Sequence, residues 1–172
     1  MKLVALLEEA SWPWRLPSLA TLSADGPQQR SLVLRRFNPK KWELVFFTDF
    51  RSTKIKELQK DPRASLHFYD SEKQLQLRLK GIINIEHQSP ASREALAEIP
   101  IDRRGDYQSG LAPGEVLSDI SETSGTKAEA NFALLRFQTK SLDYLEINRV
   151  GHRRLKAEYI VEAWTNWTII QA

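Results

Sequence analysis

Residues 30–35 read RSLVLR, residues 46–54 read FFTDFRSTK and residues 74–81 read QLQLRLKG, and these three segments decide how the chain folds. Their apolar residues follow the period of two that is typical of strands in a sheet. Hydroxyl and cationic side chains stand at Ser52, Thr53 and Lys54, where a helix should begin and where backbone N–H groups lack partners. Since Arg30 and Arg35 flank the first strand, we expect a phosphorylated cofactor to lie across the sheet.

The composition is that of one folded domain, which we expect to span residues 1–172. Its 25 cations are nearly balanced by 22 anions and form no basic stripe, which argues against a nucleic-acid partner. The chain has no cysteine, so disulfides and thiolate nucleophiles are excluded and redox chemistry would need an external cofactor. No apolar run approaches the ~20 residues that span a bilayer, so we expect a cytoplasmic protein without a membrane partner.

The first half of the chain predicts strands with two short helices. A helix is expected before Ser11, followed by strands at 19–23 and 28–37 that are joined by an Asp-Gly turn, and by a strand at 42–48. These three strands predict an antiparallel meander. A helix at 52–60 and strands at 64–69 and 74–85 follow, and the last strand should bend or bulge at Gly81.

The second half predicts a helix over 90–99, with Ser89 as its N-cap, and then further strands. Residues 100–127 form the longest loop candidate, either a functional lid or binding segment or a disordered one. Strands are expected at 131–138, 141–147, 152–161 and 167–170. Together the elements predict a mainly β fold, a mostly antiparallel barrel with a few peripheral helices.

The order of these motifs resembles the pyridoxamine 5'-phosphate oxidase superfamily of FMN-binding split barrels, and more narrowly its short oxidase-related, FMN-binding branch. The matching motifs are Arg-x-Val/Leu-x-Leu-Arg, Phe-Phe-Thr-Asp, Arg-Ser-x-Lys, Asp-Pro-x-Ala and Gln-x-Arg-x-x-Gly. They cover residues 19–85, and the resemblance resumes at 108–109, 152–154 and Trp167. It implies an antiparallel split β-barrel, FMN as cofactor and a homodimer with the flavin at the subunit interface.

The resemblance also implies roles for individual residues. The FMN phosphate would be held by a guanidinium, an ammonium and hydroxyls, which suit a doubly charged anion. The implied cofactor-site residues are Arg30, Ser52, Thr53 and Lys54 at the phosphate, Phe47 and Thr48 beside the flavin and its ribityl chain, Gln76 at the isoalloxazine edge, Arg35 near the substrate phosphate, and Gln108 and Ser109 from the partner subunit. The family usually has arginine at the Thr53 position, so one phosphate cation is missing unless Arg51 replaces it.

Three functions are open at this stage. The first is an FMN-dependent oxidoreductase acting on a small molecule, for which pyridoxamine or pyridoxine 5'-phosphate is what the superfamily name suggests. The Tyr, Arg and Ser set that grips the substrate phosphate in the family is not found in residues 92–105, so another small substrate is equally open. The second is a non-catalytic flavin-binding or flavin-sensing protein. The third is a small barrel that binds single-stranded nucleic acid.

The histidines and the tryptophans bear on these three candidate functions. The three histidines, His67, His87 and His152, have no metal-ligand spacing, so we expect no metal site. The five tryptophans stand near the ends of expected elements, where aromatic residues usually seal a core. No catalytic residue is assigned.

Overall fold

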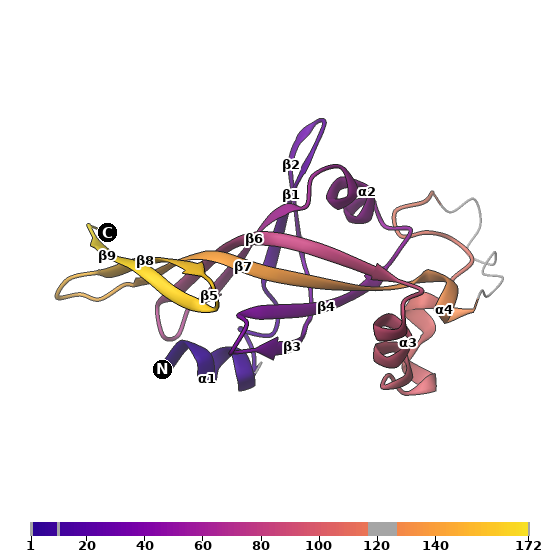
Figure 1. The fold of residues 1–172 in the computed structure, drawn as a ribbon, viewed down its shortest axis with the longest axis horizontal. Coiled ribbons are helices and arrows are strands. Elements are labelled where there is room, and N and C mark those ends of the chain that lie inside the picture. The colour runs from indigo at the N-terminus through magenta and orange to yellow at the C-terminus, as the bar shows by residue number, and fades with distance from the viewer. Residues whose placement is uncertain (1, 10, 117–126, 172) are drawn as a thin grey trace.

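The computed structural model describes residues 2–9, 11–116 and 127–171, and two long paired strands run through its centre (Figure 1). They are β6 (Leu75–His87) and β7 (Phe132–Glu146). The strand order is β2-β1-β5-β6-β7-β4-β3, and β8 and β9 extend the sheet from β7. The other strands are β1 (Ser18–Ser23), β2 (Gly26–Ser31), β3 (Leu34–Asn38), β4 (Glu43–Asp49), β5 (Arg63–Asp70), β8 (Arg153–Ile160) and β9 (Ala163–Ile170).

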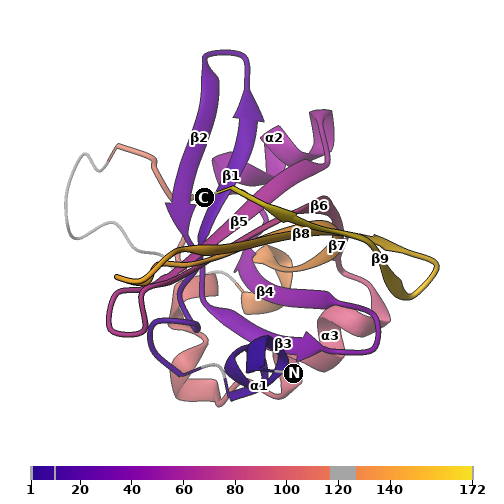
Figure 2. The same cartoon turned by 90° about the vertical axis from the view of Figure 1, so that its left-hand side faces the viewer.

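The helices lie around this sheet (Figures 1 and 2). Helices α3 and α4 gather at one end of β6 and β7, and the β8–β9 hairpin extends from the other end (Figure 1). The helical elements are α1 (Lys2–Glu9), α2 (Thr53–Lys60), α3 (Pro90–Ala97) and α4 (Ala128–Asn131), with 3-10 turns η1 (Ile101–Arg103) and η2 (Gly105–Tyr107). All strand pairs in the described residues are antiparallel, so the prediction of a mainly β, antiparallel fold with a few peripheral helices is confirmed.

Strand β4 is buried on both faces, and this explains its nearly continuous apolar sequence. Leu44 and Phe46 belong to the larger core cluster, together with aromatic residues such as Phe68 and Phe137. Val45 belongs to a second cluster that also contains residues of α3, η2 and α4. The end of β4 is therefore held rigidly between the barrel and the helical layer, and the site described below begins there.

The strand expected at 28–37 is two strands, which corrects the predicted meander. Strand β2 pairs with β1, whereas β3 pairs with β4 at the opposite edge of the sheet. Between them the backbone leaves the ladder, since Leu32 N–H donates to the Pro17 carbonyl and Leu34 N–H to the Arg15 carbonyl. The period-two pattern continues through this crossing because the side chains of Leu32 and Leu34 are buried.

The strands expected at 131–138 and 141–147 are a single strand, β7. It stays paired with β6 because a bulge absorbs one extra residue: Lys80 pairs with Ser141 and Gly81 with Thr139, so Lys140 is left without a partner position. An irregularity at Gly81 is therefore present as predicted, but the bulged strand is β7 and not the strand at 74–85. A Cβ at Gly81 would lie 2.1 Å from the Gln138 carbonyl oxygen, so the close approach of the two backbones requires glycine.

The predicted helix starts are also confirmed. Ser89 caps α3, with its hydroxyl accepting the Ser92 N–H at 3.1 Å. The expected loop at 100–127 contains η1 and η2, and its residues 117–126 lie outside the described residues. Trp14 and Trp42 are buried as expected, but Trp12 is 76% exposed and Trp167 is 50% exposed, so the expectation that tryptophans seal the core is wrong at these two positions. No helix among the described residues is long and apolar enough to cross a membrane.

Candidate functional site

The hydroxyl and cation cluster predicted from the sequence is assembled where β4 ends and α2 begins. The Lys54 ammonium donates to the hydroxyls of Thr48 and Ser52, each at 2.9 Å. Thr48 and Ser52 are both buried, and the Ser52 hydroxyl donates to the Asp49 carbonyl at 2.7 Å. Because Ser52 is the N-cap residue but makes no side-chain capping bond, the first N–H groups of α2 remain available to an anion.

Arg30 reaches the same helix from the neighbouring hairpin. Its guanidinium is bound to the Glu57 carboxylate, with Nη2 to Oε2 at 2.9 Å, and also contacts the Thr21 hydroxyl. Thr21 donates to the same carboxylate oxygen at 2.5 Å. The sequence reasoning missed Glu57 and Thr21, although Glu57 lies three residues after Lys54 and so falls on the same side of α2.

The electrostatics of this cluster favour an anion. Burial lowers the pKa of the Lys54 ammonium below its ordinary range, and the positive charge of Arg30 lowers it further. Within the described part of the chain, Lys54 has hydroxyl partners but no ion pair. Two cations near each other, hydroxyls and a helix N-terminus are the donor set that a phosphomonoester such as the FMN tail requires.

Thr53 and Arg51, which neighbour this cluster, add little to the positive charge that is available to an anion. The exposed Thr53 opens α2 and adds no charge. The Arg51 guanidinium donates to Asp49 through Nε at 3.1 Å and Nη2 at 2.6 Å, and to the Gly110 carbonyl through Nη1 at 3.1 Å. Arg51 is therefore engaged with Asp49 and Gly110, and the cation missing at Thr53 is not replaced in this arrangement.

Arg35 and Phe47 lie on the other face of β4, in a cleft of about 660 Å³. The Arg35 guanidinium carbon is 5.5 Å from the centroid of the Phe47 ring. Burial raises the pKa of the Tyr107 phenol, which also lines the cleft and interacts with Arg35, so this phenol remains a hydrogen-bond donor at neutral pH. The lining carries charges of both signs: its arginines are Arg15, Arg35, Arg36 and Arg103, and its carboxylates are Glu9, Glu98, Asp102 and Asp106. Arg36 is paired with Glu98, whereas Arg35 lies beside the Phe47 ring, so a planar molecule could pack against Phe47 and Arg35.

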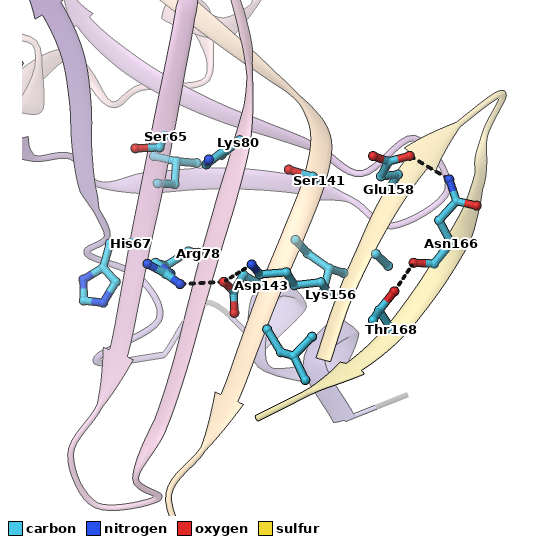
Figure 3. A pocket seen from close by; sticks show the side chains of 14 residues that line it. Ser65, His67, Arg78, Lys80, Ser141, Asp143, Lys156, Glu158, Asn166 and Thr168 are labelled. Atoms are coloured by element: carbon cyan, nitrogen blue, oxygen red, sulfur yellow. Dashed lines mark hydrogen bonds and ion pairs between the residues drawn. The ribbon is translucent and has the colours of Figure 1, made fainter. Parts of the chain in front are cut away.

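Gln76 lies elsewhere, near the start of β6 and next to a second pocket of about 670 Å³ on the outer face of the sheet (Figure 3). Successive register positions across β5 to β9 place one row of side chains in this pocket: His67, Arg78, Asp143, Lys156 and Thr168. Since side chains two apart on a strand share a face, Gln76 points from the same face as Arg78, one row along.

The Asp143 carboxylate forms ion pairs with several cations on this face. Asp143 accepts from Arg78 at 2.5 Å and from Arg154 at 2.9 Å, and the Lys156 ammonium lies 3.9 Å away. The hydrogen bonds from Arg154 lower the pKa of the Asp143 carboxyl, so this residue is ionised at neutral pH. Figure 3 shows the Arg78 and Lys156 side chains converging on Asp143 from neighbouring strands. The face carries a surplus of positive charge.

Gln108 and Ser109 follow η2 and lie close to the end of the same chain's β4. Asn131 donates to the Tyr107 carbonyl at 2.9 Å, and Arg51 donates to the Gly110 carbonyl, which fixes the segment on both sides. The structure thus brings together the phosphate cluster and the 107–110 segment but leaves Gln76 near the far end of β6. Among the described residues, no group of three or more His, Asp or Glu side chains has the arrangement of a metal site.

Residues 3–87 match the family model for the pyridoxamine 5'-phosphate oxidase, FMN-binding domain. By this match, residues 3–87 belong to the pyridoxamine 5'-phosphate oxidase superfamily. Most members of the predicted site, from Arg30 to Gln76, fall inside the matched segment, whereas Gln108 and Ser109 lie beyond it. The recognition made from the sequence motifs is therefore confirmed at the level of the superfamily.

Individual members of the superfamily show how far the similarity reaches. A pyridoxine/pyridoxamine 5'-phosphate oxidase of Thermosynechococcus vestitus is 38% identical over 79 residues, which cover 45% of this chain and only 36% of that enzyme. A pyridoxamine 5'-phosphate oxidase-related, FMN-binding protein of Nostoc punctiforme superposes with a TM-score of 0.83 at 22% identity, over 99% of this chain and 96% of the other. PhzG of Burkholderia lata, in complex with tetrahydrophenazine-1-carboxylic acid, superposes with a TM-score of 0.76 at 19% identity, over 99% of this chain and 89% of PhzG. The fold is that of the superfamily along its whole length.

Proposed function

We propose that this protein is an FMN-dependent oxidoreductase that holds the FMN phosphate between Arg30 and the N-terminus of α2. The observation that supports it best is Lys54, a partly buried ammonium whose partners are hydroxyls and whose pKa is lowered by burial and by Arg30. A phosphate bound here would offset the burial of Lys54 and its repulsion by Arg30, because it would place a negative charge beside both cations.

Bound FMN would supply the hydride and electron transfer chemistry, and the chain supplies binding and orientation. Lys54, Ser52 and the first N–H groups of α2 bind the phosphate, and Arg30 adds its guanidinium. Thr48 is buried beside Lys54 and limits the access of water to the ammonium. Since β4 is packed on both faces, these groups are held in place before the cofactor arrives, which reduces the entropy lost on binding.

The site is completed by a second copy of the chain in this proposal. Gln76 lies on the outer face of the sheet near the start of β6, whereas the phosphate cluster follows β4, which pairs with the opposite half of β7. A flavin that contacts both must bridge two subunits. The proposed homodimer therefore brings the face with Gln76 and Arg78 of one subunit against the phosphate cluster of the other.

The substrate class follows from the cleft beside Phe47. Arg35 lies beside the Phe47 ring in this cleft of mixed charge, so we propose a small planar substrate whose phosphate or carboxylate is bound by Arg35. A phosphorylated pyridine and an aromatic carboxylic acid are the two compounds to test first, because relatives are named for the one or are in complex with the other. Turnover of pyridoxamine 5'-phosphate, followed as oxygen-dependent formation of pyridoxal 5'-phosphate, separates these classes.

The FMN proposal is tested by removing the two phosphate cations together. Arg30→Ala with Lys54→Ala should weaken FMN binding by roughly 3–6 kcal/mol, at about 1.5–3 for each charge-assisted contact. The matched control is Lys56→Ala with Lys60→Ala, which removes two exposed cations from the same helix. Flavin fluorescence titration gives both dissociation constants. Retention of FMN by the first double variant would refute the proposed placement.

A non-catalytic flavin-binding protein is the second candidate, and the residue at position 53 favours it. Thr53 adds no charge where the family has arginine, and Arg51 is held by Asp49. Binding of FMN without turnover of either substrate class, and without reoxidation of the reduced flavin by any acceptor tested, would select this candidate. Salt-sensitive binding of a single-stranded oligonucleotide by colourless protein would instead select the nucleic-acid alternative.

A further inference from the structure

Glu57 is a buried carboxylate inside the cationic cluster. Its side chain is 5% exposed, and its Oε2 atom accepts from both Arg30 and Thr21. Its second oxygen, Oε1, is buried and has no hydrogen-bond partner among the described residues. A carboxylate that is only half satisfied in a buried position is unfavourable, so a stabilising role in the core does not account for it.

The charge of Glu57 opposes the ligand that the cluster otherwise favours. Arg30 and Lys54 are cationic and Glu57 is anionic, so the three side chains leave a single net positive charge. Thr53 adds none at the start of the helix. A phosphomonoester carries a charge of about −1.5 to −2 at neutral pH, so this cluster neutralises it only in part.

Arg30 is the group for which the two anions compete. Its Nη2 donates to Glu57 at 2.9 Å, and its Nη1 is directed to Thr21 and to the Gln28 carbonyl at 3.4 Å. An incoming phosphate must either share the guanidinium with Glu57 or take it over. In both cases two negative groups come within a few ångströms of each other in a partly buried place, where their repulsion is weakly screened.

We propose that Glu57 is a specificity-determining residue that competes with the FMN phosphate for Arg30 and keeps FMN binding weak and reversible. The proposal rests on the proposed function, because it presumes that the phosphate binds at this cluster. It predicts that bound FMN exchanges with FMN in solution. It also predicts that removing the charge of Glu57 strengthens the binding of FMN but not of riboflavin, which lacks the phosphate.

The test compares Glu57→Gln with the wild-type chain for two ligands. Glutamine keeps the shape and one acceptor for Thr21 and Arg30 but removes the charge, so FMN should bind on the order of tenfold more tightly. Riboflavin lacks the phosphate, and its affinity should be the same in both proteins. Glu129→Gln is the matched control, since it removes one exposed carboxylate outside the cluster and should change neither affinity.

The outcomes separate this inference from the proposed function. If neither wild-type protein nor Glu57→Gln binds FMN, the proposed function fails. If wild-type protein binds FMN but Glu57→Gln binds it equally or more weakly, or if riboflavin tightens as much as FMN, only the inference is overturned. Glu57→Met, of similar length and without charge, should change affinity in the same direction as Glu57→Gln. Failure of both variants to fold would assign Glu57 to the core and overturn the inference.

Discussion

At the level of single residues, Lys54 and Glu57 are the two side chains on which the proposed phosphate site at the start of α2 depends. Lys54 is held beside another cation with only hydroxyls as partners, and Glu57 leaves one buried oxygen without a partner. Each arrangement costs stability in the free protein. Charges of both signs meet here at the start of a helix, as expected of a site where an anion binds reversibly.

The lowered pKa of Lys54 predicts that FMN affinity depends on pH. Because the pKa of Lys54 is lowered in the folded chain, its positive charge is lost at a lower pH than that of an ordinary lysine. FMN affinity should therefore fall as pH rises through this lowered pKa. Over the same interval the unfolded chain still holds the proton that the folded chain has released, so Lys54 makes the free protein more stable as pH rises.

Titration of FMN binding from neutral to alkaline pH tests this expectation, with riboflavin as the control for titration of the flavin itself. The variant Lys54→Met should bind FMN more weakly at neutral pH and lose this part of the pH dependence. An FMN affinity that follows the same alkaline profile in wild-type protein and in Lys54→Met would contradict the role given to Lys54.

At the level of elements, the length and register of the paired strands β6 and β7 determine how far Gln76 lies from the phosphate cluster. Their pairing runs from Leu75 opposite Glu146 to His87 opposite Ala133 and is interrupted only at the Lys80/Gly81 bulge. Gly81 permits the backbone of β7 to approach closely at this point. The alternation of side chains along β6 places Gln76 and Arg78 on the outer face and Leu75, Leu77 and Leu79 in the core.

Substitution of Gly81 should therefore destabilise the whole sheet. In Gly81→Ala the new methyl group would meet the Gln138 carbonyl oxygen at 2.1 Å, so backbone must move, at a cost of about 1–3 kcal/mol in the free energy of unfolding. Gly105→Ala is the matched control, because a Cβ there meets nothing within 4 Å. Urea denaturation measures both, and equal stabilities of the two variants would count against the close approach.

At the level of the whole molecule, the two parts of the proposed flavin site lie far apart within a single chain. The phosphate cluster follows β4, and Gln76 stands near the start of β6 with the surplus positive charge of Arg78 and Lys156 beside it. Figure 1 shows helices α3 and α4 at one end of the long strands and the β8–β9 hairpin at the other. The proposed homodimer, with the flavin between its subunits, would join the two parts.

Co-expression of two defective chains tests the shared site. One chain carries Arg30→Ala with Lys54→Ala, and the other carries Gln76→Trp, which fills its outer face; neither should bind FMN alone. The mixed dimer contains one site with an intact phosphate cluster and an intact Gln76, so co-expression should restore up to one FMN per mixed dimer. A site contained within one chain would show no restoration, and a monomer in light scattering that still carries FMN would exclude the dimer.

Local sequence was sufficient for the elements and for part of the site. The Lys54 ammonium and its two hydroxyl partners, Thr48 and Ser52, lie within seven residues of sequence, so these groups could be predicted to lie together from the sequence alone. The irregularity at Gly81 and the Ser89 cap were predictable for the same reason. Each depends on backbone geometry that a few neighbouring residues impose.

Contacts between segments that are distant in sequence could be identified only from the tertiary structure. The crossing at Leu32 splits an apparently continuous strand because β2 and β3 pair at opposite edges of the sheet. The pairing of Arg30 with Glu57 requires α2 to lie against the β1–β2 hairpin, and the separation of Gln76 from Lys54 follows from the length and register of β6 and β7. Residue types and spacing specify local hydrogen bonds, whereas the partner of a buried charge depends on which surfaces the packing of the whole core brings together.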